Sequence, residues 1–328
     1  MIEQIIYLFS AFILTAILGK FIIPVLKKLK VGQSEREDGP RSHLRKQGTP
    51  TMGGIMMIIS IIIFTAISCI VIKEKDYIIS ILAVASASIG FGIIGFIDDF
   101  KKVILKNTDG LNPKLKMFGL LIISIIYTIF LTRYLNMDTY VLIPFTSLKI
   151  NLPMWIYVPF IIFVMLGSTN AINLTDGVDG LAGSICTIML TAMSILSIKL
   201  GNLGISIFGS IVAGSCAGFL IYNFHKAKVI MGDTGSLLLG GAISSMAIFL
   251  NNPLVLIIIA IVPIIETLSV IMQVLYFRKT GKRLFRMSPL HHHFELKGWR
   301  ENRVVAVFSA VTFAASLIGI FSGVIHFI

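Results

Sequence analysis

Charged residues and cysteines are scarce in this chain. Only 13% of its 328 residues are Asp, Glu, Lys or Arg, whereas 56% are hydrophobic, a balance that a soluble protein could not tolerate on its surface. The three cysteines, Cys69, Cys186 and Cys216, lie inside apolar runs without CxxC spacing, which gives no evident disulfide framework or zinc site. No internal repeat or low-complexity linker stands out, so we treat residues 1–328 as one membrane-embedded domain.

Long apolar runs are abundant instead. Ten of them are long enough, or nearly so, to cross roughly 30 Å of hydrocarbon as a helix. They are residues 3–26, 52–72, 77–97, 117–135, 154–170, 181–198, 203–224, 236–251, 254–277 and 304–325. The first run carries Glu3, has no basic leader and exceeds a signal-peptide core, so we interpret it as an uncleaved span. The composition therefore predicts an all-α polytopic membrane protein with about ten transmembrane helices.

The net charge of +12 is distributed unevenly between the loops. Most of the 28 lysines and arginines fall in loops on one side of the predicted bundle, at 27–50, 98–116, 225–235 and 278–303. The polar loop near 171–180 belongs to the same side. Because basic loops stay in the cytoplasm, we expect these loops there and both termini outside, and we do not expect nucleic-acid binding. On the other side, the alternating segment 139–153 predicts a small extracytoplasmic β-hairpin.

One of the loops on the predicted cytoplasmic side starts with a pair of aspartates. Asp98 and Asp99 end the third run, and Lys102 and Lys106 follow at helical spacing in "DDFKKVILK". If the helix continues, Asp98, Lys102 and Lys106 share one face. A surface ion pair between Asp98 and Lys102, worth a few tenths of a kcal/mol, is the structural alternative.

Two further loops on this side concentrate carboxylate and amide groups. The segment "NLTDGVDGLAG" contains Asn173, Asp176 and Asp179, and "MGDTGS" contains Asp233, with Asn223 ten residues upstream. Aspartates at these positions could simply cap the following helices. Capping, however, does not require so many amides and carboxylates within a few residues.

Aspartate and asparagine oxygens are ligands suited to magnesium, and lysines beside them would attract phosphates. This side of the membrane is therefore a candidate for phosphoryl transfer between a soluble phosphorylated donor and a lipid acceptor. Glu266, within the apolar run "IVPIIETLSV", is either functional or paired inside the bundle. A cation-coupled transporter would also contain such acids, but its polar residues should gather near the bilayer midplane.

Three consecutive histidines stand in "SPLHHHFELKGW". A further span follows them, which argues against a terminal tag, and three adjacent histidines cannot easily ligate one ion. Basic residues nearby place them better to bind a diphosphate or to move a proton near neutral pH. These residues are His291, His292 and His293, with Arg283, Arg286 and Lys297 around them. A merely solvated basic loop is the alternative.

The order of "KQGTPTMGG", "DDFKK", "NLTDGVDGLAG", "MGDTGS" and "SPLHHHFELKGW" resembles the bacterial phospho-N-acetylmuramoyl-pentapeptide transferases, a family of the polyprenyl-phosphate N-acetylhexosamine-1-phosphate transferase superfamily. The likeness covers nearly the whole chain. It implies magnesium-dependent transfer of phospho-N-acetylmuramoyl-pentapeptide from its UDP carrier to undecaprenyl phosphate, which releases UMP and forms lipid I on the cytoplasmic face of the bacterial cell membrane. It also implies a homodimer.

The resemblance assigns roles to individual residues. Asp98 and Asp99 match the paired catalytic aspartates, Asp233 matches the metal ligand, and Asn173 is a second candidate ligand. Asp233 and His291 are also expected among the catalytic residues. The expected substrate contacts are Lys46, Thr51, Lys102, Lys106, Lys114, Asn173, Asp176, Asp179, Asn223, His292 and His293. Ile230 stands where the family pattern has Phe, so a stacking contact to uracil is expected to be weaker or supplied elsewhere.

Two questions stay open at this point. Asp98 could deprotonate or orient the lipid phosphate for one displacement, or Asp98 or Asp99 could form a phospho-aspartate first. A sister enzyme that transfers N-acetylglucosamine-1-phosphate to the same lipid shares the aspartate motifs, although the histidine segment favours the muramoyl branch.

Overall fold

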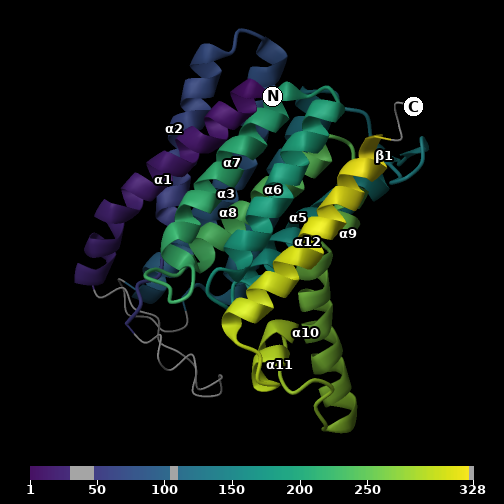
Figure 1. The fold of residues 1–328 in the computed structure, drawn as a ribbon. Coiled ribbons are helices and arrows are strands. Elements are labelled where there is room, and N and C mark those ends of the chain that lie inside the picture. Colours follow the sequence, from purple (N-terminus) through teal and green to yellow (C-terminus); the bar gives the residue numbers. More distant parts are fainter. Residues whose placement is uncertain (30–47, 104–109, 325–328) are drawn as a thin grey trace.

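The computed structural model describes residues 1–29, 48–103 and 110–324, and within these ranges the protein is predominantly helical (Figure 1). Each predicted apolar run falls on a helical segment. The long helices are α1 (Ile2–Lys28), α2 (Gly54–Val71), α3 (Lys75–Val103), α4 (Pro113–Ile129), α5 (Met154–Thr175), α6 (Leu181–Lys199), α7 (Leu203–Asn223), α8 (Gly232–Phe249), α10 (Ile261–Thr280) and α12 (Glu301–Val324). Shorter segments are η2 (Phe130–Tyr134), η3 (Pro253–Val255), α9 (Leu256–Ile259) and α11 (Leu290–Leu296).

Nine helices of the described ranges are long and apolar enough to cross a membrane, which makes this a multi-pass membrane protein. The run that falls short is α8, because its first turn contains Asp233 and its sequence contains several glycines and serines. Nearly every residue of α8 is buried against other helices, so α8 does not need the hydrophobicity that contact with lipid requires. The expectation of about ten membrane helices therefore holds, with α8 as an internal one.

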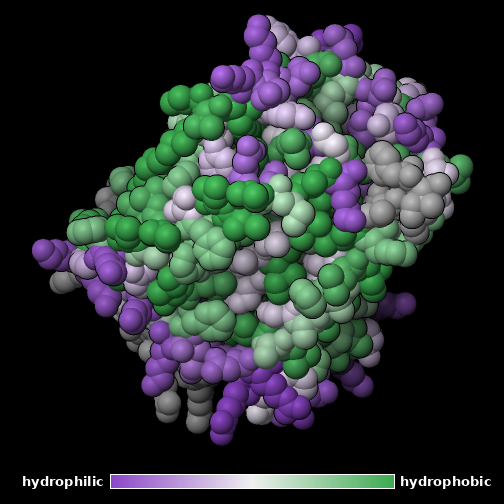
Figure 2. All heavy atoms as spheres, turned by 45° about the horizontal axis from the view of Figure 1, so that its top comes forward, coloured by the Kyte–Doolittle hydropathy of each residue, from purple (hydrophilic) through white to green (hydrophobic). Residues whose placement is uncertain are grey.

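The helices form layers around α7 and α8. In α7 also, most residues are buried, whereas α1 exposes an apolar face that includes Ile5, Phe9 and Ile13. Figure 2 shows hydrophobic residues over the middle of the visible face and hydrophilic residues above and below them. This distribution is typical of a protein whose central belt contacts hydrocarbon.

The predicted span 254–277 is interrupted in the structure. It comprises η3, α9 and α10, with a break at Ala260, whose φ of −97° and ψ of 26° are not helical. Pro263 lies in the first turn of α10, where its missing N–H leaves no helical hydrogen bond unmade. Beyond the break, α10 leaves the bundle at an angle (Figure 1). Most of its side chains are exposed.

The predicted hairpin is confirmed. Strands β1 (Tyr140–Leu142) and β2 (Lys149–Asn151) are antiparallel, with Tyr140 opposite Asn151. In Figure 1 the hairpin, the N-terminus and the end of α12 lie toward the upper end of the bundle, and α10 and α11 extend from the lower end. The described chain ends thus share the hairpin's side, while the side of the membrane to which each end belongs stays a prediction.

Candidate active site

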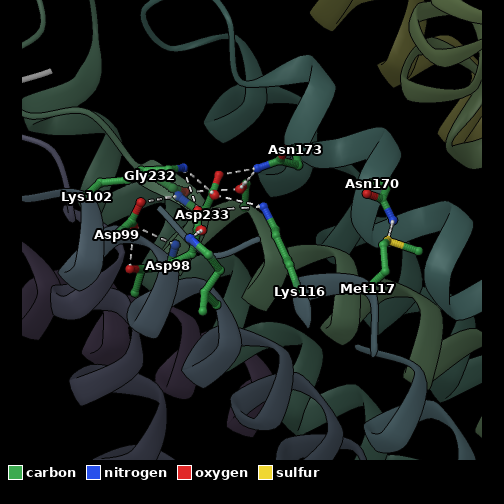
Figure 3. A network of polar contacts seen from close by, with 12 residues as sticks. Asp98, Asp99, Lys102, Lys116, Met117, Asn170, Asn173, Gly232 and Asp233 are labelled. Atoms are coloured by element: carbon green, nitrogen blue, oxygen red, sulfur yellow. Dashed lines mark hydrogen bonds and ion pairs between the residues drawn. The ribbon is translucent and has the colours of Figure 1, made fainter. Parts of the chain in front are cut away.

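The three predicted key aspartates meet where α3 ends and α8 begins. Asp98 and Asp99 are only 2% and 3% exposed, and one carboxylate oxygen from each of Asp98, Asp99 and Asp233 lies within 4.8 Å of the others (Figure 3). Gly95, one turn earlier in α3, allows this approach, because a Cβ there would lie 2.1 Å from the carbonyl oxygen of Asp233. We call Asp98, Asp99 and Asp233 the acidic cluster.

Asp99 holds the start of α8. Its Oδ2 accepts hydrogen bonds from the Thr234 hydroxyl at 2.6 Å and the Thr234 N–H at 2.8 Å, and its Oδ1 accepts the Asp233 N–H at 3.2 Å. A carboxylate at a helix N-terminus satisfies free amides and faces the positive end of the helix dipole. Asp99 therefore acts as a cap, but one supplied by a different helix, and it fixes where Asp233 sits.

Asp98 and Asp233 are bound by lysines from two helices. Asp98 forms the expected i,i+4 ion pair with Lys102, and its Oδ1 accepts the Leu111 N–H at 2.7 Å. Lys102 Nζ also lies 3.0 Å from Asp233 Oδ2, and Lys116 Nζ of α4 lies 2.8 Å from the same oxygen. The pair of Asp98 and Lys102 is thus part of a larger network rather than an isolated surface pair (Figure 3).

Asn173, in the last turn of α5, completes the contacts of Asp233. Its Nδ2 donates to Asp233 Oδ1 at 2.7 Å and to the Ser236 hydroxyl at 2.9 Å. The carboxylate oxygens of the acidic cluster form a donor set that fits a magnesium ion. Asn173 presents its amide nitrogen to Asp233, so service as a metal ligand would require its oxygen to turn toward the ion.

Thr51 lies beside the acidic cluster. The segment around it runs alongside the chain before α8: the Gly53 N–H donates to the Ile230 carbonyl at 2.9 Å, and the Ile230 N–H donates to the Pro50 carbonyl at 2.8 Å. Gly232 has a φ of +74°, and a Cβ there would lie 2.5 Å from Asp99 Oδ2 and 2.9 Å from Thr51 Oγ1. Glycine is therefore needed in the "MGDTG" turn.

Two predicted substrate contacts, Lys46 and Lys106, lie outside the described residues.

The other predicted nucleotide-side residues join two loops. Asn223 is buried; its Oδ1 accepts the Gly180 N–H at 2.9 Å and its Nδ2 donates to the Val229 carbonyl at 3.0 Å. Asp179 Oδ2 accepts the Ala227 N–H at 3.0 Å. These contacts fix the loop after α5 against the loop after α7. Asp176 is half-buried at the C-terminal end of α5, and substrate contacts by Asp176, Asp179 and Asn223 stay predictions.

The same region contains a second group of titratable side chains that the sequence did not indicate. His225 Nδ1 lies 3.8 Å from Asp179 Oδ2 and 3.7 Å from an oxygen of Glu301, in the first turn of α12. This group joins α12 to the two loops on the same side of the bundle as the acidic cluster.

The histidine segment is helical, and its three rings have different partners. His291 is fully buried in α11; its Nδ1 lies 3.2 Å from Glu266 Oε2, and its N–H donates to Glu266 Oε1 at 3.2 Å. Glu266 is therefore paired inside the bundle. A Cβ at Gly177 would lie 2.2 Å from His291 Nε2, so this ring packs against the loop that follows Asn173.

His292 and His293 are held by neighbours within the same segment. His292 Nδ1 lies 2.8 Å from Glu295 Oε2, and His293 Nδ1 accepts the Arg286 N–H at 3.1 Å. Partial burial lowers the pKa of His293, and the nearby charges of Lys297 and Arg286 lower it further. A neutral imidazole agrees with the acceptor role of Nδ1.

Known proteins are similar to this chain over almost its entire length. The chain matches glycosyl transferase family 4 over residues 81–251. A phospho-N-acetylmuramoyl-pentapeptide-transferase from Staphylococcus aureus is 47% identical over 321 residues, which are 97% of this chain and 99% of that protein. A protein of the same name from Halalkalibacterium halodurans is 44% identical over 323 residues, 98% of each chain. This chain belongs to the phospho-N-acetylmuramoyl-pentapeptide-transferase family. The resemblance inferred from the motifs is thereby confirmed.

The prediction from the family's motifs missed one lysine of the site. Those motifs selected Lys114, yet Lys114 is exposed in the first turn of α4, and it is Lys116 that reaches the acidic cluster. Two residues apart on a helix differ by about 200° in direction, so Lys114 and Lys116 face opposite ways. The sequence gives only part of this result: Asn112 caps α4 and Pro113 begins it, which places Lys114 and Lys116 on opposite faces, but which face meets the acidic cluster depends on how the helices pack. A role for Lys114 at another part of the substrate stays a prediction.

The close approach of α3 to α8 gives a testable consequence. We expect Gly95→Ala to lower both transfer activity and thermal stability, because its Cβ would press on the Asp233 carbonyl and displace the start of α8. Overpacking of this kind costs typically about 1–3 kcal/mol. Gly167→Ala is the matched control, since nothing lies within 4 Å of a Cβ at that position of α5. Thermal unfolding in detergent and product formation would be measured together; wild-type values for Gly95→Ala would contradict the tight packing.

Proposed function

We propose that this protein transfers phospho-N-acetylmuramoyl-pentapeptide from its UDP carrier to undecaprenyl phosphate, forming lipid I and UMP in the first membrane step of peptidoglycan synthesis. The observation that carries the proposal is the convergence of Asp98, Asp99 and Asp233 with the ammonium groups of Lys102 and Lys116 at one end of a helical bundle. Family membership supports the choice of substrates, because the relatives carry the name of this transferase.

The charges of the site suit phosphoryl transfer. Lys102 and Lys116 can turn toward the diphosphate of the donor and offset the charge that develops on it. A magnesium ion, when bound by the acidic cluster, would neutralise phosphate oxygens and stabilise the leaving UMP. Asp99 fixes Asp233 through the start of α8. Asp98 lies next to these groups, and it can accept a proton from the lipid phosphate or orient that phosphate for attack.

The two-step route through a phospho-aspartate is the competing mechanism. It requires an aspartate oxygen free to attack the donor phosphorus, and both oxygens of Asp99 accept hydrogen bonds from the start of α8. Asp98 is then the better nucleophile candidate, because its Oδ2 is held only by an ion pair with lysine and not by backbone amides. A stoichiometric burst of UMP without any lipid acceptor would support that route, whereas strict dependence on the lipid supports the single displacement that we favour.

We also propose the orientation and assembly of the protein. The basic loops are expected in the cytoplasm, so the acidic cluster would face the cytoplasm, and both termini and the hairpin would lie outside. The cluster lies at the C-terminal end of α3, the opposite end from the turn between α2 and α3, which agrees with this topology. A homodimer is proposed from the family resemblance alone.

The test of function is donor-dependent release of UMP. Detergent-purified protein with magnesium, undecaprenyl phosphate and UDP-N-acetylmuramoyl-pentapeptide should release UMP, and omission of the lipid should stop the release. UDP-N-acetylglucosamine in place of that donor should give at most a few per cent of the rate. The opposite preference would assign the protein to the sister transferases. Passage of a labelled substrate across sealed vesicles without UMP release would instead favour a transporter.

A further inference from the structure

Lys116 places a positive charge directly beside Asp233, a predicted metal ligand. It projects from α4, and its Nζ lies 2.8 Å from Asp233 Oδ2 and 4.0 Å from Asp98 Oδ2. Met117 follows Lys116 in α4, and its sulfur lies 3.8 Å from Asn170 Nδ2 of α5, so α4 packs against α5 here (Figure 3). The backbone of α4 therefore holds the base of the Lys116 side chain beside the acidic cluster.

Asp233 Oδ2 is shared by two ammonium groups. Lys102 approaches it at 3.0 Å and Lys116 at 2.8 Å, while Oδ1 accepts the amide of Asn173. A carboxylate oxygen has two lone pairs, and two donors fill them. A divalent ion that binds this oxygen must therefore displace at least one ammonium group, and it also repels both.

The two lysines differ in the carboxylate partner that each would retain after a metal ion displaced it from Asp233. Lys102 is four residues from Asp98 on α3 and forms an ion pair with it, so Lys102 keeps a carboxylate partner without Asp233. The second contact of Lys116, to Asp98, is 4.0 Å long and therefore weak. The side chains of Lys116 and Lys102 are 18% and 39% exposed, so both ammonium groups have room to move, and it is the weaker remaining contact that makes Lys116 the one displaced.

We propose that Lys116 is an exchangeable counter-ion of Asp233. It neutralises this carboxylate when no metal is bound, and it moves to the diphosphate of the nucleotide-linked donor when a divalent ion takes its place. Lys116 is thus a positioning residue that keeps Asp233 ordered before substrates arrive and then contributes to donor binding. This inference rests on the proposed function, because it assumes a divalent ion at Asp233 and a diphosphate donor.

The exchange predicts opposite effects of one substitution on two ligands. Lys116→Met removes the competing charge, so Mn²⁺ should bind the donor-free protein about 3- to 10-fold more tightly, as measured by electron paramagnetic resonance. The same variant should raise the KM for the donor about 10-fold or more, because a charge-assisted contact to phosphate is lost. If Lys116 served only to stabilise the fold, its replacement would weaken both Mn²⁺ binding and donor binding. Lys116→Arg keeps the charge and should leave Mn²⁺ affinity close to wild type.

Two further variants make the outcome decisive. Lys101→Met removes the same charge from the neighbouring last turn of α3 and should change neither quantity more than about twofold. Asp233→Asn should abolish Mn²⁺ binding. If it does, and Lys116→Met leaves Mn²⁺ affinity unchanged or weaker, the exchange is wrong while the metal site stands. Absence of any Mn²⁺ binding by the wild type would overturn the metal site of the proposed function together with the exchange, and lipid-dependent UMP release would still test the transfer reaction itself.

Discussion

Asp98→Asn should reduce the rate of lipid-dependent UMP release by about 10²- to 10⁴-fold, the usual contribution of a positioned acid or base. The asparagine has the same shape and can still accept the Leu111 N–H, so the end of α3 should remain in place. The loss should therefore appear in kcat, with thermal unfolding close to wild type. A variant that keeps more than about a tenth of the activity would exclude Asp98 from the chemical step.

Comparison with Asp99→Asn tests whether the neighbouring aspartate has a different role. Asp99 receives three hydrogen bonds from Asp233 and Thr234 at the start of α8, and an amide cannot accept all of them as a carboxylate does. Loss of a helix cap costs about 0.5–2 kcal/mol, so this variant should lose stability as well as activity. Equal loss of activity in both variants, with lower stability in Asp99→Asn alone, would separate chemistry at Asp98 from positioning by Asp99.

The pH dependence of Asp98→Asn distinguishes two roles for this carboxylate. The second pKa of a phosphate monoester is about 6, so the lipid phosphate is mostly dianionic at pH 8 and mostly monoanionic at pH 5.5. If Asp98 takes the remaining proton, the ratio of wild-type to variant rates should rise as the pH falls, because the variant can use only the dianion. If Asp98 only orients the phosphate, the ratio should stay constant across this range.

Periodicity and length predicted the helices well because the bilayer imposes simple requirements. A helix that contacts lipid must be apolar where it crosses the hydrocarbon, and the runs gave both ends of α1, α2, α6 and α7 within about two residues. The starts or ends of α3, α4 and α5 extend further than their runs, because their additional residues include polar ones. The interruption at Ala260 was not predictable from hydropathy, because the sequence remains apolar on both sides of the break. Only the packing of α9 in the bundle and the departure of α10 from it reveal that the run has two parts (Figure 1).

The site was predictable to the extent that its residues stand in short motifs. Asp98, Asp99, Asp233 and Asn173 were identified from their spacing and from the family resemblance, and the structure brings all four together. Contacts between residues far apart in the sequence could not be predicted in the same way. Nothing in the sequence connects Lys116 with Asp233 or Glu266 with His291, since each pair joins distant segments whose contact depends on how the helices pack.

Asp233→Asn should have the largest effect on metal dependence. Three donors converge on this carboxylate, and two of them, Lys102 and Lys116, are cations that a neutral amide cannot balance. We expect activity to fall at least about 10³-fold and to resist rescue by high magnesium, because the ion would lose a charged ligand in the acidic cluster. Asp98→Asn, in contrast, should keep measurable Mn²⁺ binding.

Asp138→Asn supplies the matched control for this change. Asp138 is an exposed acid between η2 and β1, at the hairpin end of the bundle, so the same loss of charge there should leave activity and metal binding unchanged. Asp233→Glu restores the charge with a longer arm, and it should recover part of the Mn²⁺ affinity but little of the rate, because the start of α8 fixes the distance to Asp98 and Asp99. Magnesium-dependent activity of Asp233→Asn within tenfold of wild type would mean that the ion is held elsewhere, and the ammonium groups on Asp233 would then be permanent partners rather than exchangeable ones.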